Sequence, residues 1–246
     1  MTPDKLEGAK RARKRARGVT LLEVLVVMIL LSLVMGGVVL GGGQIASARL
    51  KHTATMLAGA VRVGFLRATA TSKSQRLVFD MDERKVWLEE SELPMLVQSK
   101  DTSATGGADP ATEFERKALE ENDRILKGPR PVRPKFKPVS SLGFSDGSGA
   151  KGPRPIDRGI TFREIQAIHD DLPRLSGRAY LYFWPGGQTE MANIQVRIGQ
   201  SLDAGDTLTL VVSPLTGKVT VKNGPIPFVL PLDDKAASDR DDRGVF

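Results

Sequence analysis

Residues 19–43 are a run of 25 residues whose only charged side chain is Glu23. About 20 consecutive apolar residues are enough for a helix to cross the hydrocarbon core of a membrane. Residues 1–18 carry seven basic and two acidic side chains, and a basic segment beside a span stays in the cytoplasm. The sequence therefore predicts one transmembrane helix, with the N-terminus cytoplasmic and the rest of the chain on the other side. A mean hydropathy of −0.18 excludes a membrane protein with many spans.

Two ordinary interpretations of this run each leave one feature unexplained. A secretory signal peptide fits the small-residue site Ala-Ser-Ala at 46–48, after which the mature chain would begin at Arg49. The apolar core of such a peptide is about 7 to 15 residues long, however, and this run is longer. An uncleaved anchor explains the length, but a carboxylate within a span costs about 2.5 to 3.5 kcal/mol. Glu23 therefore needs a partner or a function.

The residues around Glu23 favour a third interpretation. Residues 17–25 read RGVTLLEVL, in which a basic leader ends in glycine and a glutamate follows five residues later within an apolar helix. This pattern resembles the N-terminus of type IV pilins and of the pseudopilins of type II secretion systems. The resemblance implies that a prepilin peptidase removes the leader 1–18 by cleavage between Gly18 and Val19, and methylates the new amine of Val19. It also implies a single-pass protein of the inner membrane with a periplasmic C-terminal domain.

Glu23 has a physical role in assembly in this interpretation. Cleavage leaves an ammonium group on Val19, and Glu23 lies four residues along the same helix, about one turn away. In a filament, the carboxylate of one subunit is expected to pair with the amine of a neighbouring subunit, which offsets the cost of membrane insertion only on assembly. The alternative is that Glu23 simply reaches the lipid headgroups from a position near the helix end.

The helical pattern continues beyond the apolar run. Residues 44–75 are predicted to extend the helix as an amphipathic segment that packs on a sheet, because apolar side chains recur at intervals of three and four. Five glycines at 36–37 and 41–43 separate the two halves, and each costs about 1 kcal/mol of helix propensity relative to alanine. They indicate either a hinge or the end of the membrane span. The stripe consists of Met56, Leu57, Ala60, Val61, Gly64, Phe65 and Ala68.

Most of the remaining chain shows the two-residue period of β-strands. A hairpin is predicted at 77–88, with its turn at 81–84. The expected fold class is α+β and pilin-like: a long N-terminal helix packed on antiparallel sheet, with a β-rich domain formed by 76–90 and 156–232. Further strands are predicted at 160–163, 179–184, 192–198, 207–212 and 219–222.

Residues 91–155 interrupt this pattern. They hold eight of the fifteen prolines, seven glycines and twenty charged side chains, too little apolar material to supply core strands. A short charged helix is predicted at 111–127 within an otherwise flexible, solvated insertion, and the tail 233–246 is predicted to be disordered. A basic strip in the insertion is an alternative contact for an acidic partner or anionic lipid. It comprises Lys127, Arg130, Arg133, Lys135 and Lys137, interleaved with Pro129, Pro131, Pro134 and Pro138.

A second, looser resemblance lies in the C-terminal part. It is to the H-type minor pseudopilins of type II secretion and the related FimT/FimU-like minor pilins. It implies a structural subunit of the pseudopilus, involved in protein export across the outer membrane, with other pseudopilins as partners. No calcium site is expected, because the glycine- and aspartate-rich calcium loop of the major pseudopilin is not evident. The residues that carry the resemblance are 183–187 (FWPGG), Ile194, Val196 and 214–219 (PLTGKV).

The sequence offers no constellation typical of an enzyme. It has no cysteine, its two histidines, His52 and His169, are far apart, and it has neither a phosphate-binding loop nor a nucleophile elbow. We therefore expect a non-enzymatic protein with no catalytic residue, no metal site and no cofactor.

Two side-chain clusters have ordinary interpretations. His169 with the carboxylates of 170–171 is followed by Leu-Pro, which predicts a solvated loop. Tyr180, Tyr182 and Trp184 alternate along one predicted strand and therefore share a face. We expect them to pack in the core against the long helix.

The charge distribution bears on the partners. Residues 1–18 account for +5 of the net charge of +7, which leaves +2 for the rest of the chain, so no nucleic-acid partner is expected. The predicted partners are other minor and major pseudopilins, the prepilin peptidase and lipid of the inner membrane. Two rival functions remain: a minor pilin of a type IV pilus or DNA-uptake system, and a monomeric membrane-anchored or secreted binding protein.

Overall fold

A first helix, α1 (Leu21–Thr71), is followed by two antiparallel sheets. The chain divides into two compact units, residues 1–44 and 45–246, and α1 begins in the first and ends in the second. The predicted leader 1–18 and tail 233–246 lie outside the described residues. A computed structural model describes residues 20–95, 105–125, 133–139 and 152–229, with all side chains in these ranges except those of 34, 36–44 and 122–125.

The elements after α1 all belong to the second unit. They are β1 (Ser74–Asp80), β2 (Lys85–Ser91), α2 (Glu113–Ile125), β3 (Lys137–Pro138), β4 (Arg154–Pro155), β5 (Ile160–Ala167), β6 (Arg178–Trp184), β7 (Gln188–Thr189), β8 (Ala192–Ile198), the 3₁₀ turn η1 (Ala204–Asp206), β9 (Thr207–Val212) and β10 (Val219–Asn223).

α1 starts where the sequence provides a cap. The hydroxyl of Thr20 accepts a hydrogen bond from the backbone N–H of Glu23 at 3.2 Å, which satisfies one of the free N–H groups of the first turn. The helix then runs through the five glycines of 36–43 without interruption, so its backbone is not unwound there. Within the described residues, no helix combines the length and the apolar character that a membrane span requires.

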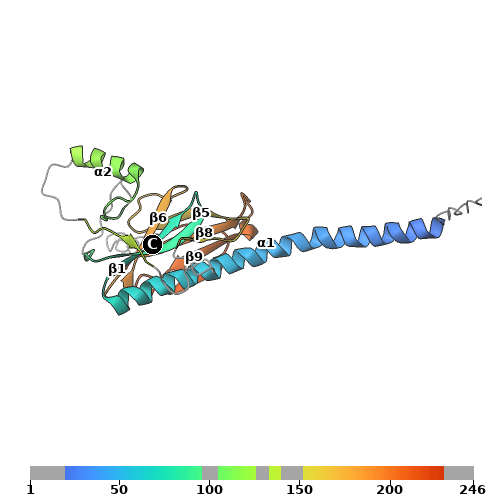
Figure 1. Cartoon of the computed structure of the whole chain (residues 1–246), viewed down its shortest axis with the longest axis horizontal. Coiled ribbons are helices and arrows are strands. Elements are labelled where there is room, and N and C mark those ends of the chain that lie inside the picture. Colours follow the sequence, from blue (N-terminus) through green and yellow to red (C-terminus); the bar gives the residue numbers. More distant parts are fainter. Residues whose placement is uncertain (1–19, 96–104, 126–132, 140–151, 230–246) are drawn as a thin grey trace, which may run out of the picture. The chain divides into compact units, whose positions relative to one another are not determined.

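The two sheets are built from neighbouring antiparallel strands (Figure 1). Sheet A has the order β3-β2-β1-β6-β7, with β4 also paired to β2, and sheet B has the order β10-β9-β8-β5. The β1–β2 register pairs Asp80 with Lys85 across the turn 81–84. The predicted hairpin and the predicted strands of the C-terminal half are therefore confirmed, and with them the α+β class.

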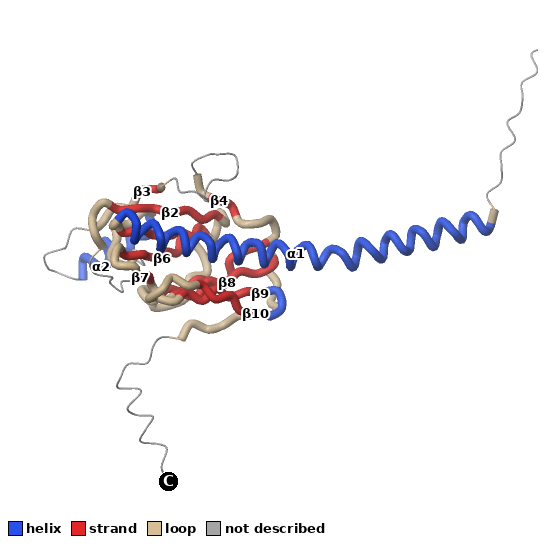
Figure 2. The backbone as a smooth tube through the Cα atoms, turned by 90° about the horizontal axis from the view of Figure 1, so that it is seen from below, coloured by secondary structure: helices blue, strands red, loops and turns tan. Residues whose placement is uncertain are grey.

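The main core lies between the second half of α1 and one face of each sheet. In Figure 2 this part of the helix crosses the strands of both sheets. The predicted stripe is confirmed, because Leu57, Ala60, Val61 and Ala68 are buried, while Met56 and Phe65 are half-buried at its margin. Each fully buried Leu, Val or Phe side chain contributes about 1.5 to 3 kcal/mol. The sheets contribute Leu77, Phe79, Leu88, Leu181, Phe183, Ile194, Val196, Leu210 and Val212, among others.

A bulge keeps β5 in register with this core. The pairing with β8 shifts between Phe162 and Glu164, so Arg163 is the extra residue of a β-bulge. Buried Phe162 lies before the bulge and buried Ile165 after it; without the bulge, the period of two would turn Ile165 to the opposite face. The sequence pattern predicted a strand only as far as 163 because the alternation changes phase at that residue.

The approach of α1 to sheet A is close enough to require glycine. A Cβ atom added to Gly64 would lie 2.6 Å from Cε2 of Phe183, whereas one added to Gly59 would meet no atom within 4 Å. We expect Gly64→Ala to lower the free energy of unfolding by about 1 to 3 kcal/mol through overpacking. Gly59→Ala, the matched control on the same helix, is expected to raise it by up to about 1 kcal/mol. Urea unfolding of both variants measures the difference; equal effects would contradict the packing argument.

Several described residues between 91 and 155 are buried, which differs from the prediction of a solvated insertion. Met95, Ala108 and Glu115 are buried, with exposed fractions of 3%, 0% and 3%. β3 and β4 both pair with the outer edge of β2. The predicted helix at 111–127 is confirmed as α2. The segment adds a layer to sheet A through polar contacts and edge pairing, which its low apolar content did not reveal.

Candidate functional site

Of the predicted processing and assembly residues, the structure describes Glu23. Gly18 and Val19 lie outside the described residues. Glu23 is exposed in the first turn of α1, where the partial positive charge of the helix N-terminus favours a carboxylate. Thr20 and Glu23 also have the spacing of a capping box. The Thr-x-x-Glu spacing of residues 20–23 is a local sequence signal for this cap.

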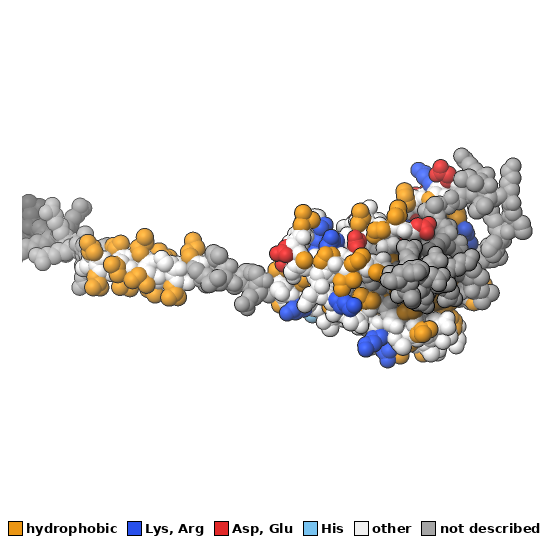
Figure 3. Space-filling view, turned by 180° about the vertical axis from the view of Figure 1, so that it is seen from behind, with side chains coloured by type: hydrophobic (Ala, Val, Ile, Leu, Met, Phe, Trp, Pro, Cys, Tyr) orange, Lys and Arg blue, Asp and Glu red, His pale blue; other side chains and the backbone are white. Residues whose placement is uncertain are grey.

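The surface around Glu23 is apolar and uncovered. The described side chains from Leu21 to Leu33 are all exposed, with Leu21 at 84% and Leu22 at 72%, and apolar side chains cover the visible face of these turns (Figure 3). A helix that is apolar all round is normally buried in lipid or among other helices. This segment of the first unit therefore has the surface of an element that acquires its neighbours outside the chain itself.

A second group of polar residues lies on the face of sheet A that points away from α1, beneath the insertion. The alternating aromatic residues of β6 each donate a hydrogen bond to a residue of the insertion. Tyr180 donates to Oε1 of Glu115 at 2.6 Å, Tyr182 to the carbonyl of Thr105 at 2.5 Å, and Nε1 of Trp184 to the carbonyl of Met95 at 2.8 Å. The three aromatics do share a face, as predicted, but the expectation that they pack against the long helix is wrong.

Glu115 fastens α2 to this face. Its Oε2 accepts hydrogen bonds from the backbone N–H groups of Ala111 and Thr112, and the Thr112 hydroxyl accepts one from the N–H of Glu115. This capping box fixes the start of α2. Burial and the neighbouring Glu115 carboxylate raise the pKa of Tyr180, so that its hydroxyl stays protonated and donates to Glu115. One carboxylate thus both starts the helix and attaches it to β6.

Arg76 lies at the centre of this layer with an exposed fraction of 1%. Its guanidinium carbon is 4.5 Å from the ring centre of Phe136, an insertion residue, and 4.5 Å from that of Tyr180. Its Nε donates to Oε2 of Glu89 at 2.7 Å, and Oε1 of Glu89 accepts from Nε1 of Trp87 at 2.8 Å. The charge of Arg76 is therefore paired with a carboxylate and lies against two aromatic rings, which offsets the cost of its burial.

The predicted solvated loop around His169 is a buried cluster, so that prediction is wrong for His169 and Asp170. His169 is 2% exposed, and its Nδ1 lies 2.7 Å from Oε2 of buried Glu190. Asp170 is 5% exposed and accepts a hydrogen bond from Nε of Arg174 at 3.0 Å. Only Asp171 is exposed, as expected. The partner Glu190 is 21 residues away in sequence, so no local pattern indicated the pair.

The His169 pair makes stability depend on pH. Burial alone would lower the pKa of His169, but the carboxylates of Glu190 and Asp170 outweigh it and raise the pKa above its ordinary value. The stabilisation is therefore complete below about pH 6.5 and is lost as the pH rises through the raised pKa. We expect the free energy of unfolding to fall over this rise in pH, and less steeply in His169→Gln. Urea unfolding across the pH range measures both slopes; equal slopes would contradict the pairing.

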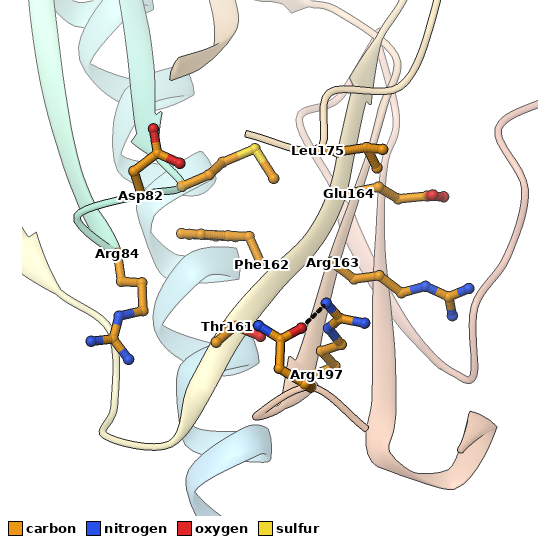
Figure 4. A pocket seen from close by; sticks show the side chains of 10 residues that line it. Asp82, Arg84, Thr161, Phe162, Arg163, Glu164, Leu175 and Arg197 are labelled. Atoms are coloured by element: carbon orange, nitrogen blue, oxygen red, sulfur yellow. Dashed lines mark hydrogen bonds between the residues drawn. The ribbon is translucent and has the colours of Figure 1, made fainter. Parts of the chain in front are cut away.

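A pocket of about 710 Å³ lies between the β1–β2 turn and β5 (Figure 4). Met81 and Phe162 line it, and Nη2 of Arg197 donates to Gln200 at 2.7 Å. Arg163 and Glu164 project away from Phe162 on the other side of β5 (Figure 4), as the bulge dictates. Its polar lining includes Thr161 and the carboxylates of Asp82 and Glu164, and the Thr161 hydroxyl already donates a hydrogen bond to the carbonyl of Gly199.

The N-terminal segment matches a known family model. Residues 13–39 match the prokaryotic N-terminal methylation motif. This range contains Gly18, Val19 and Glu23, so the prediction of a prepilin-type methylation motif is confirmed. Such a motif marks a chain for prepilin processing and for pilus-like assembly with other pilins, with its N-terminus anchored in the membrane. No curated protein matches the chain significantly.

Two solved structures resemble the chain, both of the minor pseudopilin EpsH from the type II secretion system of Vibrio cholerae. One has a TM-score of 0.38 and 7% sequence identity, and covers 71% of this chain and 95% of EpsH. The other has a TM-score of 0.40 and 8% identity, and covers 74% of this chain and 98% of EpsH. The α+β fold of this chain is established by its own helix and sheets.

Proposed function

We propose that this chain is a minor pseudopilin, a structural subunit of a type II secretion pseudopilus that takes part in protein export across the outer membrane. The observation that carries the proposal is the methylation motif at 13–39, placed at the start of a long capped helix whose second half packs on antiparallel sheets. The resemblance of residues 183–187 and 214–219 to H-type subunits supports the minor subtype. The chain acts in this role by assembly, without chemistry of its own.

The first unit would hold the chain in the inner membrane. Residues 19–43 form the span, with the leader 1–18 on the cytoplasmic side and the sheet domain in the periplasm. The uniformly exposed apolar side chains from Leu21 to Leu33 support this role. So does the basic leader, because positive charge is retained on the cytoplasmic side.

Assembly would use the carboxylate of Glu23. The cap at Thr20 holds Glu23 in the first turn of α1, and Glu23 is four residues along the chain from Val19, where cleavage would create an amine. In the low dielectric of the membrane an ion pair is much stronger than in water, and an unpaired carboxylate is costly. Pairing of Glu23 with the Val19 amine of a neighbouring subunit therefore favours the filament over the isolated subunit in lipid.

Cleavage is the first test of this function. Co-expression with a prepilin peptidase should yield a mature chain that begins at Val19 and carries one added methyl group, as read by N-terminal sequencing and intact mass. Gly18→Val should retain the leader, because the resemblance to prepilins implies cleavage directly after this glycine, while Gly8→Val, within the leader, is the matched control. A mature chain that begins at Arg49 would contradict the proposal and favour a secreted binding protein. An intact Met1 would favour a plain anchor.

The type IV pilus alternative shares the same N-terminal motif. Secretin, ATPase and further pseudopilin genes beside this gene would support secretion, and pilus genes would support the alternative. In a host that has both systems, deletion of the gene should reduce the export of secreted enzymes and leave surface pili in place. The opposite result would assign the chain to a pilus.

A further inference from the structure

A groove of about 460 Å³ lies between the end of β2 and the insertion segment 133–139. Its apolar part includes Leu93, which is 48% exposed, together with Pro138 and Val139. Its cationic rim includes Lys135 and Lys137, both of which are exposed. The groove is thus lined both by apolar side chains and by exposed ammonium groups.

The rim is held rigidly by contacts on both sides of the two lysines. The carbonyl of Pro134 accepts a hydrogen bond from the N–H of Asp109 at 3.0 Å, and the N–H of Val139 donates to the carbonyl of Leu88 at 2.9 Å. Between them, Phe136 stacks on Arg76 and lies 5.6 Å from the Tyr182 ring, centre to centre. Successive side chains of an extended segment point to opposite sides. Because Phe136 points inward, its two lysine neighbours are both presented outward.

The two lysines are not neutralised within the described part of the chain. Neither Lys135 nor Lys137 forms an ion pair there. Glu90, which is the cross-strand neighbour of Lys137, is already paired with Arg67 at 3.0 Å and Lys73 at 3.4 Å. Among the described residues, the groove therefore has two exposed cations without an ion-pair partner, about 7 Å apart as alternate residues of an extended chain.

We propose that this basic groove binds an extended acidic segment of a partner protein. Carboxylates on alternate residues of an extended chain have the same spacing as Lys135 and Lys137, and an apolar side chain beside them would contact Leu93. Recognition is through side chains, because Pro134 and Pro138 lack the N–H groups that would pair with an added strand. Holding the lysines in place before binding reduces the entropy lost on binding.

A protein segment fits this groove better than a membrane surface does. Glu90 and Glu92 line the groove together with the lysines, and their carboxylates would repel a sheet of anionic headgroups. A single extended chain can instead direct its carboxylates to Lys135 and Lys137. The interaction is independent of the assembly role of Glu23, so it can be tested without a filament.

The test uses the full chain in zwitterionic nanodiscs and a fluorescent nine-residue peptide of alternating glutamate and threonine with a central leucine. Fluorescence anisotropy should show binding at least about tenfold tighter than that of the same peptide with lysine for glutamate, and weakening as salt is added. Lys135→Glu with Lys137→Glu should weaken binding at least about tenfold. The control pair Lys218→Glu with Lys222→Glu, exposed lysines at the other sheet with the same change in net charge, should change it less than about twofold.

Three outcomes would overturn the proposal. If the acidic peptide fails to bind at millimolar concentration, the groove is not a binding site for acidic segments. Equal weakening in both double variants shows an effect of net charge and not of the groove. The third outcome concerns flotation of the chain with vesicles that contain phosphatidylglycerol. If the Lys135→Glu, Lys137→Glu variant alone loses this flotation but still binds the peptide as before, the lysines contact a membrane. Circular dichroism confirms that the exposed substitutions leave the fold intact.

Discussion

Glu89→Ala is expected to lower the free energy of unfolding by about 3 to 5 kcal/mol, because it leaves the charge of Arg76 buried without its partner. Arg76 is 1% exposed, and Nε lies 2.7 Å from the lost carboxylate. The substitution also removes the acceptor for the indole N–H of Trp87. Urea unfolding of the detergent-solubilised chain, followed by tryptophan fluorescence, measures the loss.

The matched control is an exposed ion pair in the same hairpin. Lys85 and Glu83 lie 3.1 Å apart with side chains 42% and 67% exposed, and Glu83→Ala should change stability by less than about 1 kcal/mol. Glu89→Gln, which keeps an acceptor for Arg76, should fall between the two. A loss in Glu89→Ala no larger than that of the control would show that solvent reaches Arg76 and that the insertion does not cover it.

Glu23→Leu is expected to reduce secretion and crosslinking to other pseudopilins by about tenfold or more, while the chain still enters the membrane. Leucine makes the span more apolar, so insertion is favoured. The substitution removes the partner of the Val19 amine, however, and a tenfold loss corresponds to only about 1.4 kcal/mol of assembly free energy. An ion pair in a low-dielectric environment exceeds that amount. Enzyme export and cysteine crosslinking in a secretion-competent host measure the effect.

The control for Glu23 is a change in polarity without a change in charge. Ser32, whose hydroxyl donates to the carbonyl of Met28 within α1, becomes apolar in Ser32→Leu, and this variant should secrete normally. Glu23→Asp should recover part of the function, because it keeps the carboxylate. Unchanged export and crosslinking in Glu23→Leu would show that the proposed pairing with the Val19 amine is wrong.

Features that depend on near neighbours in the chain were predictable. The processing motif lies within nine residues, and the stripe of α1 needs only the helical period. The β1–β2 hairpin follows from two alternating strands around a four-residue turn. In each case the deciding interactions join residues close in sequence, so the pattern contains the information.

The insertion shows where such reasoning fails. Its composition predicted solvated chain, because few apolar residues were available to contribute to a core. Sheet A holds it instead through Tyr180 and Glu115, which are 65 residues apart, and through the stacking of Phe136 on Arg76. From the sequence alone, a charged residue such as Glu115 is expected to be exposed to solvent, because only the fold brings its hydrogen-bond partner close to it.

The sequence by itself determined the prepilin-type N-terminus, the face of α1 that packs and the longer strands, because local period and spacing encode all three. Only the tertiary structure decided which face of sheet A the insertion covers, why Arg76 and His169 are buried, and where β5 changes phase. Those outcomes depend on pairing between distant residues such as His169 and Glu190. A buried charge is tolerated only when the fold supplies its partner, and no local pattern records that partner.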